Sequence, residues 1–251
     1  SVCLFRLATS EASCQASEDA PIHAADGPVF REIRETYNTL LVNSMDETVF
    51  EVGPHPIEWV SRTGDFILLD IRRSTTDMYV KNRTLPVQSV PGVLQSVSEN
   101  TRHIVFLTRQ ASGQMYVTMV EKPSGRAVFQ KRETRLYGHL DMTLDGVIYT
   151  LREEYDGNYA TLRSIPAGGN EFQNLLQIDL LTPVTSLAVS PHNVLAIGMQ
   201  DGAVIIVSLD SLTYETFQAL QTGVTHLAFS PDSRYLAVAG RDGITIFAVL
   251  P

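Results

Sequence analysis

The stretch Phe229–Phe247 reads FSPDSRYLAVAGRDGITIF and decides the fold. Its apolar runs Tyr235–Ala239 and Ile244–Val249 are separated by Asp242-Gly243, a dipeptide that favours tight hairpin turns. A third apolar run, Val224–Phe229, ends at a Ser-Pro-Asp turn just before them. Short apolar runs bounded by turn residues are typical of strands, so the stretch predicts three antiparallel strands in succession.

A second copy of this pattern stands upstream, where Val189–Val207 reads VSPHNVLAIGMQDGAVIIV. Its Ser-Pro pair lies 40 residues before the Ser-Pro pair of the first copy, and its Asp201-Gly202 lies 41 residues before Asp242-Gly243. The extra residue falls in the intervening turn, where an insertion is tolerated best. Two copies in tandem indicate an internal repeat.

Weaker copies extend the repeat toward the N-terminus. Their turn anchors are spaced by 37, 45, 47 and 40 residues and are Ser61, Ser98, Thr143, Ser190 and Ser230. Repeats of about 40–45 residues with four short strands each are typical of propeller blades. We therefore predict an all-β chain that forms a β-propeller of six or seven four-stranded blades, with a further hairpin over Thr39–Val52 that turns at Met45–Glu47.

The N-terminal part is less regular. The segment Val2–Ala8 is strand-like but has no hairpin partner nearby, so we predict that it closes the ring beside Ile244–Val249. Residues 9–27 are poor in large apolar groups and predict a loop or a disordered insertion. One or two turns of helix are expected over Phe30–Asn38. We expect residues 1–251 to form a single propeller domain of a larger protein, because the chain lacks an initial Met.

With those residues in view, Val184–Val207 and Val224–Val249 resemble WD40 repeats. The Trp-Asp pair of that family is missing, since Val207-Ser208 and Phe247-Ala248 occupy its place, and the one Gly-His pair lies too close to Thr143. Apolar packing is therefore expected to close the ring. The structural turns that match the family are Ser190, Pro191, Asp201, Gly202, Ser230, Pro231, Asp232, Asp242 and Gly243.

The resemblance implies a non-catalytic scaffold that binds other proteins. A second resemblance leaves an alternative open: Ser98–Phe106, SENTRHIVF, is similar to the repeats of extracytoplasmic TolB-like propellers, which implies a ligand or an envelope partner. An enzyme with a pocket built from several blades is the third alternative.

Charge is spread unevenly over the chain, which carries a net charge of −9. Residues 1–61 carry −7, residues 62–135 carry +6 and residues 136–251 carry −8. Plain solvation of these charges is the first interpretation of the basic middle segment. The alternative is that the segment binds an acidic protein or an anionic surface through Arg72, Arg73, Lys122, Arg126, Lys131, Arg132 and Arg135. Nucleic acid is disfavoured, because aromatic residues for base stacking are sparse there and the isoelectric point is about 5.1.

The sequence predicts no enzyme, cofactor or metal site. Its 6 histidines are scattered without metal-ligand spacing, and no nucleophile-elbow motif occurs. No apolar run approaches the length of about 18 residues that would span a bilayer. The 2 cysteines, Cys3 and Cys14, are expected to be reduced thiols in a cytoplasmic or nuclear protein, with a periplasmic or secreted protein as the alternative.

Overall fold

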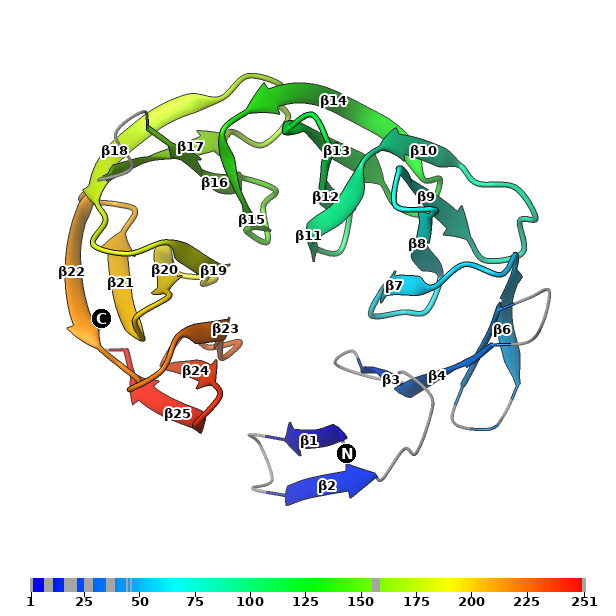
Figure 1. Ribbon diagram of the computed structural model, residues 1–251, viewed down its shortest axis with the longest axis horizontal. Coiled ribbons are helices and arrows are strands. Elements are labelled where there is room, and N and C mark those ends of the chain that lie inside the picture. Colours follow the sequence, from blue (N-terminus) through cyan, green and yellow to red (C-terminus); the bar gives the residue numbers. More distant parts are fainter. Residues whose placement is uncertain are drawn as a thin grey trace. The chain divides into compact units, whose positions relative to one another are not determined.

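A computed structural model describes residues 2–6, 11–15, 22–24, 29–34, 39–43, 45, 47–154 and 159–249, and before residue 39 it describes only the side chain of Glu32. Within these ranges every regular element is a β-strand and none is a helix, which confirms the predicted all-β class (Figure 1). Contacts divide the chain into two compact units: unit 1 comprises residues 1–94 and 123–126, and unit 2 comprises residues 95–122 and 127–251.

Unit 1 contains three sheets. Strands β1 and β2 form a two-stranded sheet, and β3–β6 and β7–β10 each form a four-stranded antiparallel sheet in chain order. Apolar residues of the two four-stranded sheets, among them Leu41, Phe50 and Ile67, form one buried cluster. The strands are β1 (Val2–Arg6), β2 (Glu11–Gln15), β3 (Ile22–Ala24), β4 (Val29–Arg34), β5 (Thr39–Val42), β6 (Thr48–Val52), β7 (Ile57–Val60), β8 (Phe66–Ile71), β9 (Thr75–Val80) and β10 (Gln88–Pro91).

Three predictions for the N-terminal part are wrong. The expected helix over Phe30–Asn38 is contradicted at residues 30–34, which belong to strand β4 and pair with both β3 and β5, so sheet pairing overrides the local helix pattern. Residues 35–38 lie outside the described ranges. The expected loop over 9–27 contains strands β2 and β3. The N-terminal strand β1 does have a hairpin partner, because it forms a two-stranded sheet with β2, and within the described residues β25 pairs with β24 alone. The single-domain organisation stays a prediction.

Unit 2 repeats one motif. Strands β11–β14, β15–β18 and β19–β22 form four-stranded antiparallel sheets in chain order, and β23–β25 form a three-stranded sheet. The strands are β11 (Val93–Glu99), β12 (His103–Arg109), β13 (Gln114–Glu121), β14 (Arg126–Thr134), β15 (Leu136–Met142), β16 (Ile148–Glu153), β17 (Tyr159–Ile165), β18 (Gln173–Asp179), β19 (Val184–Val189), β20 (Val194–Met199), β21 (Ala203–Ser208), β22 (Thr213–Gln218), β23 (Val224–Phe229), β24 (Tyr235–Gly240) and β25 (Gly243–Ala248).

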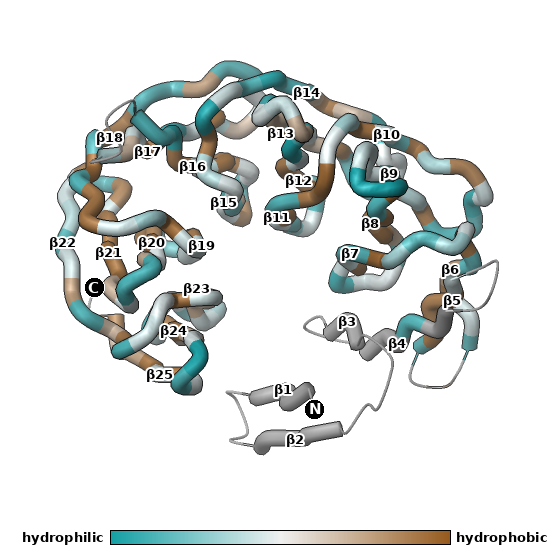
Figure 2. The backbone as a smooth tube through the Cα atoms, viewed as in Figure 1, coloured by the Kyte–Doolittle hydropathy of each residue, from teal (hydrophilic) through white to brown (hydrophobic). Residues whose placement is uncertain are grey.

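Apolar packing between successive sheets holds unit 2 together. One buried cluster joins Leu151 and Leu162 of the β15–β18 sheet to Leu195 and Ile205 of the β19–β22 sheet. Similar clusters join this pair of sheets to the sheets before and after it. Hydrophobic residues concentrate on the central strands, as β8 and β21 illustrate in Figure 2. A twisted sheet that buries its faces against its neighbours is a propeller blade, and the fold is a β-propeller.

The repeat found in the sequence marks the turn between the first two strands in five of the blades, those that begin with β7, β11, β15, β19 and β23. The side-chain oxygen of Ser190 accepts a hydrogen bond from the amide of Val194 at 3.1 Å, and Ser230 does the same for Tyr235 at 3.0 Å. Ser61 and Thr143 occupy the corresponding places. In the remaining blade the role falls to Asn100, whose side chain accepts from the amide of His103 at 2.8 Å, so the anchor at Ser98 was misplaced by two residues.

Candidate interaction surface

Two of the predicted partner-binding residues stand in a turn of unit 1. Arg72 and Arg73 join β8 to β9, are exposed, and have φ angles of 54° and 57°. The amide of Arg73 donates to the carboxylate of Asp70 at 2.7 Å, which fixes the turn. A turn held in this way presents two guanidinium groups from a defined backbone.

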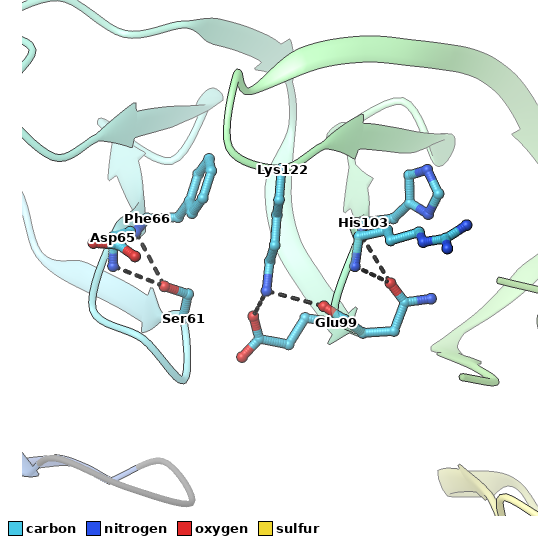
Figure 3. Close-up of polar contacts among 8 residues, drawn as sticks. Ser61, Asp65, Phe66, Glu99, His103 and Lys122 are labelled. Carbon is cyan, nitrogen blue, oxygen red and sulfur yellow. Dashed lines mark hydrogen bonds and ion pairs between the residues drawn. The ribbon is translucent and has the colours of Figure 1, made fainter. Parts of the chain in front are cut away.

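Lys122, which follows β13 of unit 2, is part of the fold. Its ammonium group lies 2.5 Å from the carboxylate of Glu99 and 3.0 Å from the carbonyl oxygen of Asn100 (Figure 3). The side chains of Lys122 and Glu99 are only 14% and 6% exposed. Because the charge of Lys122 is buried and paired, this lysine joins two strands of one blade and is not available to a partner.

The outer strand β14 carries the next predicted residues. Its side chains alternate between exposed and half-buried, so Arg132 points to solvent while Lys131 and Glu133 turn toward the sheet. Lys131 forms an ion pair with Glu171, and Glu133 forms one with Arg163 at 3.2 Å. These pairs neutralise the inward charges, so Arg132 is the cation that this part of the strand displays.

Arg126 and Arg135 lie at the two ends of β14. Arg126 is its exposed first residue and belongs to unit 1, where its amide donates to the hydroxyl of Ser124 at 3.2 Å. Arg135 is half-buried between β14 and β15, with a φ of 63°. The predicted set therefore divides into four exposed arginines, Arg72, Arg73, Arg126 and Arg132, and three residues with partly or wholly internal side chains.

A polar link between blades escaped the sequence analysis. One carboxylate oxygen of Asp141 on β15 accepts from the Ser98 hydroxyl on β11 at 2.5 Å, and the other accepts from the Val189 amide on β19 at 2.7 Å. One side chain thus bridges the first strands of three successive blades. The partners lie 43 and 48 residues away in the sequence, so the only signal was an acidic residue in an otherwise strand-like segment.

The remaining polar groups serve the turns. The Ser230 hydroxyl donates to the carboxylate of Asp232 at 2.6 Å, and this hydrogen bond, followed by one from the Arg234 amide, lowers the pKa of Asp232. Asp201 accepts from the amide of Ala203 at 3.1 Å beside Gly202, whose φ is 90°. Asp201-Gly202 and Asp242-Gly243 both lie in hairpin turns between paired strands.

Chemistry-bearing side chains do not converge within the described ranges. Among those residues no three His, Cys, Asp or Glu side chains are grouped as a metal site would require. Burial lowers the pKa of the half-buried His139 on β15. No helix in the described part of the chain is long and apolar enough to cross a membrane. Cys3 and Cys14 are register partners in the β1–β2 pair, and their side chains lie outside the described set.

Comparisons with known proteins agree with this architecture. Residues 213–246 match the model of the family described as WD domain, G-beta repeat, so this segment is similar to a WD40 repeat. The structure is similar to that of Kluyveromyces lactis Hsv2, a propeller protein, with a TM-score of 0.65 and 12% sequence identity over 93% of this chain and 76% of that one. No curated protein matches the sequence significantly. At 12% identity the structural likeness concerns the fold alone.

Proposed function

We propose that the chain is a non-catalytic scaffold that binds other proteins within a complex, in the cytoplasm or the nucleus. The main observation behind the proposal is that the blades bury their apolar side chains but expose arginine side chains on turns and outer strands. The blades bury their apolar residues against one another, whereas Arg72, Arg73 and Arg132 are exposed. The similarity of residues 213–246 to a WD40 repeat supports the same reading, because propellers of this kind generally bind proteins.

A rigid support makes exposed side chains effective in binding. The turn that carries Arg72 and Arg73 is fixed by Asp70, and β14 is held in a four-stranded sheet. Groups that are already ordered lose less conformational entropy when a partner binds. Arginine also presents a planar fork of donors that matches carboxylates, and it is enriched at the centres of protein interfaces.

The test is quantitative affinity purification of the wild-type chain and of R72E/R73E and R132E. We expect a reproducible set of proteins with the wild type, and loss of at least some of them with one of the two variants. All substituted side chains are exposed, so the thermal unfolding midpoints should stay close to that of the wild type. Arg241 is also exposed, in the turn between β24 and β25, so R241E is the matched control for a single charge reversal. Recovery of no proteins, or of the same proteins at the same level with every variant, would contradict the proposal.

A further inference from the structure

Unit 1 has an open groove at one end of its β7–β10 sheet. It has a volume of about 670 Å³ and is formed by the loop of residues 82–88, which leads from β9 to β10, and by residues 124–126. A groove of roughly 300–1,000 Å³ falls in the range of known binding sites. All of these residues belong to unit 1.

The walls of the groove are held by contacts inside unit 1. The amide of Arg83 donates to the Val80 carbonyl at 3.0 Å, and the Val87 amide donates to the Met78 carbonyl at 2.8 Å. The side-chain amide of Gln88 donates to the Gly125 carbonyl at 3.1 Å and so ties the two walls together.

The second wall also packs closely against the sheet. Gly125 has a φ of 69°, and a Cβ atom at its position would lie only 2.6 Å from a methyl group of Val87. The backbone of residues 124–126 therefore approaches the β9–β10 loop as closely as only glycine allows, and the groove exists before any ligand binds.

The lining combines positive charge with exposed apolar surface. It contains two arginines, Arg83 and Arg126, both exposed, and no carboxylate. Leu85 is 75% exposed at the rim, next to Pro86. Lys81 extends the basic character along the same loop. The nearby turn of residues 61–65 adds Arg62 and Asp65, since the Lys81 amide donates to the Asp65 carbonyl.

We propose that this groove binds an acidic peptide segment of a partner protein. Its carboxylates would face Arg83 and Arg126, and one apolar side chain would pack against Leu85 and Pro86. The proposal rests on the scaffold function and names the class of partner for one surface. An extended peptide fits better than an enclosed small molecule, because residues 81–85 are all exposed and the groove is open. Its lining contains no aromatic side chain on which a nucleic-acid base could stack.

The test uses the whole chain and a phage-displayed library of random linear peptides as the probe. We expect selected peptides with an excess of Asp and Glu and one large apolar residue. Their synthetic fluorescent versions should bind R83E/R126E about tenfold or more weakly than the wild type, measured by fluorescence anisotropy at physiological salt. L85S should weaken binding severalfold by removing the apolar contact. If R83E/R126E does not fold, R83Q/R126Q removes both charges without reversing them.

R234E/R241E is the matched control, because it reverses two exposed charges in the turns at the two ends of β24, in unit 2. Neither arginine lines the groove, so this variant should bind the peptides as the wild type does. Failure to select acidic peptides, or selected peptides that bind R83E/R126E as tightly as the wild type, would overturn the proposal. So would vesicles of phosphatidylcholine and phosphatidylserine that bind in an R83E/R126E-sensitive way while no peptide is selected, because the ligand would then be a membrane.

The two proposals can fail separately. Suppose that R72E/R73E or R132E recovers fewer proteins in affinity purification, while the groove variants bind the selected peptides like the wild type. The scaffold function is then supported, and the peptide-binding role of the groove is wrong. If no protein is recovered at all, the scaffold function falls whatever peptides the groove selects.

Discussion

At the scale of single residues, basic side chains that look alike in the sequence have different roles. Lys122 and Lys131 form ion pairs with glutamates 23 and 40 residues away, and Arg72, Arg73 and Arg132 are exposed. The sequence could show that the middle segment is basic, but it could not show these pairs, because they depend on which strands become neighbours. The partner-binding role of the exposed arginines stays a prediction.

Lys122 provides a stability test at this scale. K122M removes one member of a mostly buried ion pair, so we expect the free energy of unfolding to fall by about 2–4 kcal/mol. Urea unfolding monitored by circular dichroism measures it, with R132M on the exposed face of β14 as the matched control. If K122M were as stable as R132M, the buried pair with Glu99 would not contribute to the fold.

His139 makes stability depend on pH. Burial lowers the pKa of its imidazole from the ordinary value of 6.5, because desolvation disfavours the charged form. As the pH falls below 6.5 the unfolded chain therefore takes up this proton before the folded chain does. The contribution of neutral His139 is complete above that pH and declines as the pH falls toward the folded-state pKa.

The corresponding experiment compares the wild type with H139Q in urea unfolding at several pH values. The stability of the wild type relative to H139Q should be largest at neutral pH and should decrease in acid. A difference between the two proteins that does not change between about pH 5 and pH 8 would show that His139 has the same pKa folded and unfolded.

At the scale of strands and turns, prediction was best where the repeat was clearest. The predicted strands Val224–Phe229, Tyr235–Ala239 and Ile244–Val249 agree with β23, β24 and β25 to within one residue at each end. The prediction was least accurate where the local sequence pattern favours a helix but the segment pairs in a sheet, as in β4. The turn role of Asn100 was not predicted, because its side-chain amide oxygen replaces the hydroxyl oxygen used in the other blades. The nearby hydroxyl residue Ser98 was assigned that role instead.

A comparison of alanine substitutions at the turn glycines Gly202 and Gly113 distinguishes the cost of backbone strain from the cost of steric crowding. Both have left-handed φ angles, 90° and 84°. A Cβ atom at Gly202 would lie 2.3 Å from the Leu220 carbonyl oxygen, whereas one at Gly113 would meet nothing within 4 Å.

We therefore expect G113A to lower the free energy of unfolding by about 1 kcal/mol, from the φ angle alone. G202A should cost clearly more than that, roughly 3 kcal/mol or above, because the backbone must also move. Chemical denaturation of both variants measures the difference. Equal losses would mean that the turn at Gly202 relaxes freely.

At the scale of the whole molecule, the propeller class could be predicted because the repeat can be recognised in the sequence, whereas the polar contacts between blades could not be predicted. Apolar packing between blades was expected and is present in each unit. The Asp141 bridge was not expected, since it depends on three strands from three blades. The bridge joins β11, β15 and β19, which come first in three of the four sheets of unit 2.

D141A tests how much this bridge contributes. It leaves the Val189 amide without the carboxylate that accepts its hydrogen bond, so we expect a loss of about 2–3 kcal/mol in the free energy of unfolding. E215A, on the exposed outer strand β22, is the control and should be nearly neutral. A neutral D141A would mean that apolar packing alone aligns the three blades.

The most direct test of the central claim, that a rigid propeller binds proteins through exposed arginine-bearing turns and strands, is hydrogen exchange with and without a protein recovered by affinity purification. We expect slower exchange in peptides that cover Arg72–Arg73, residues 82–88 with 124–126, or Arg132, and unchanged, slow exchange in the buried strands β20 and β21. Unchanged exchange in all of those exposed segments, or altered exchange throughout the buried strands, would contradict that claim.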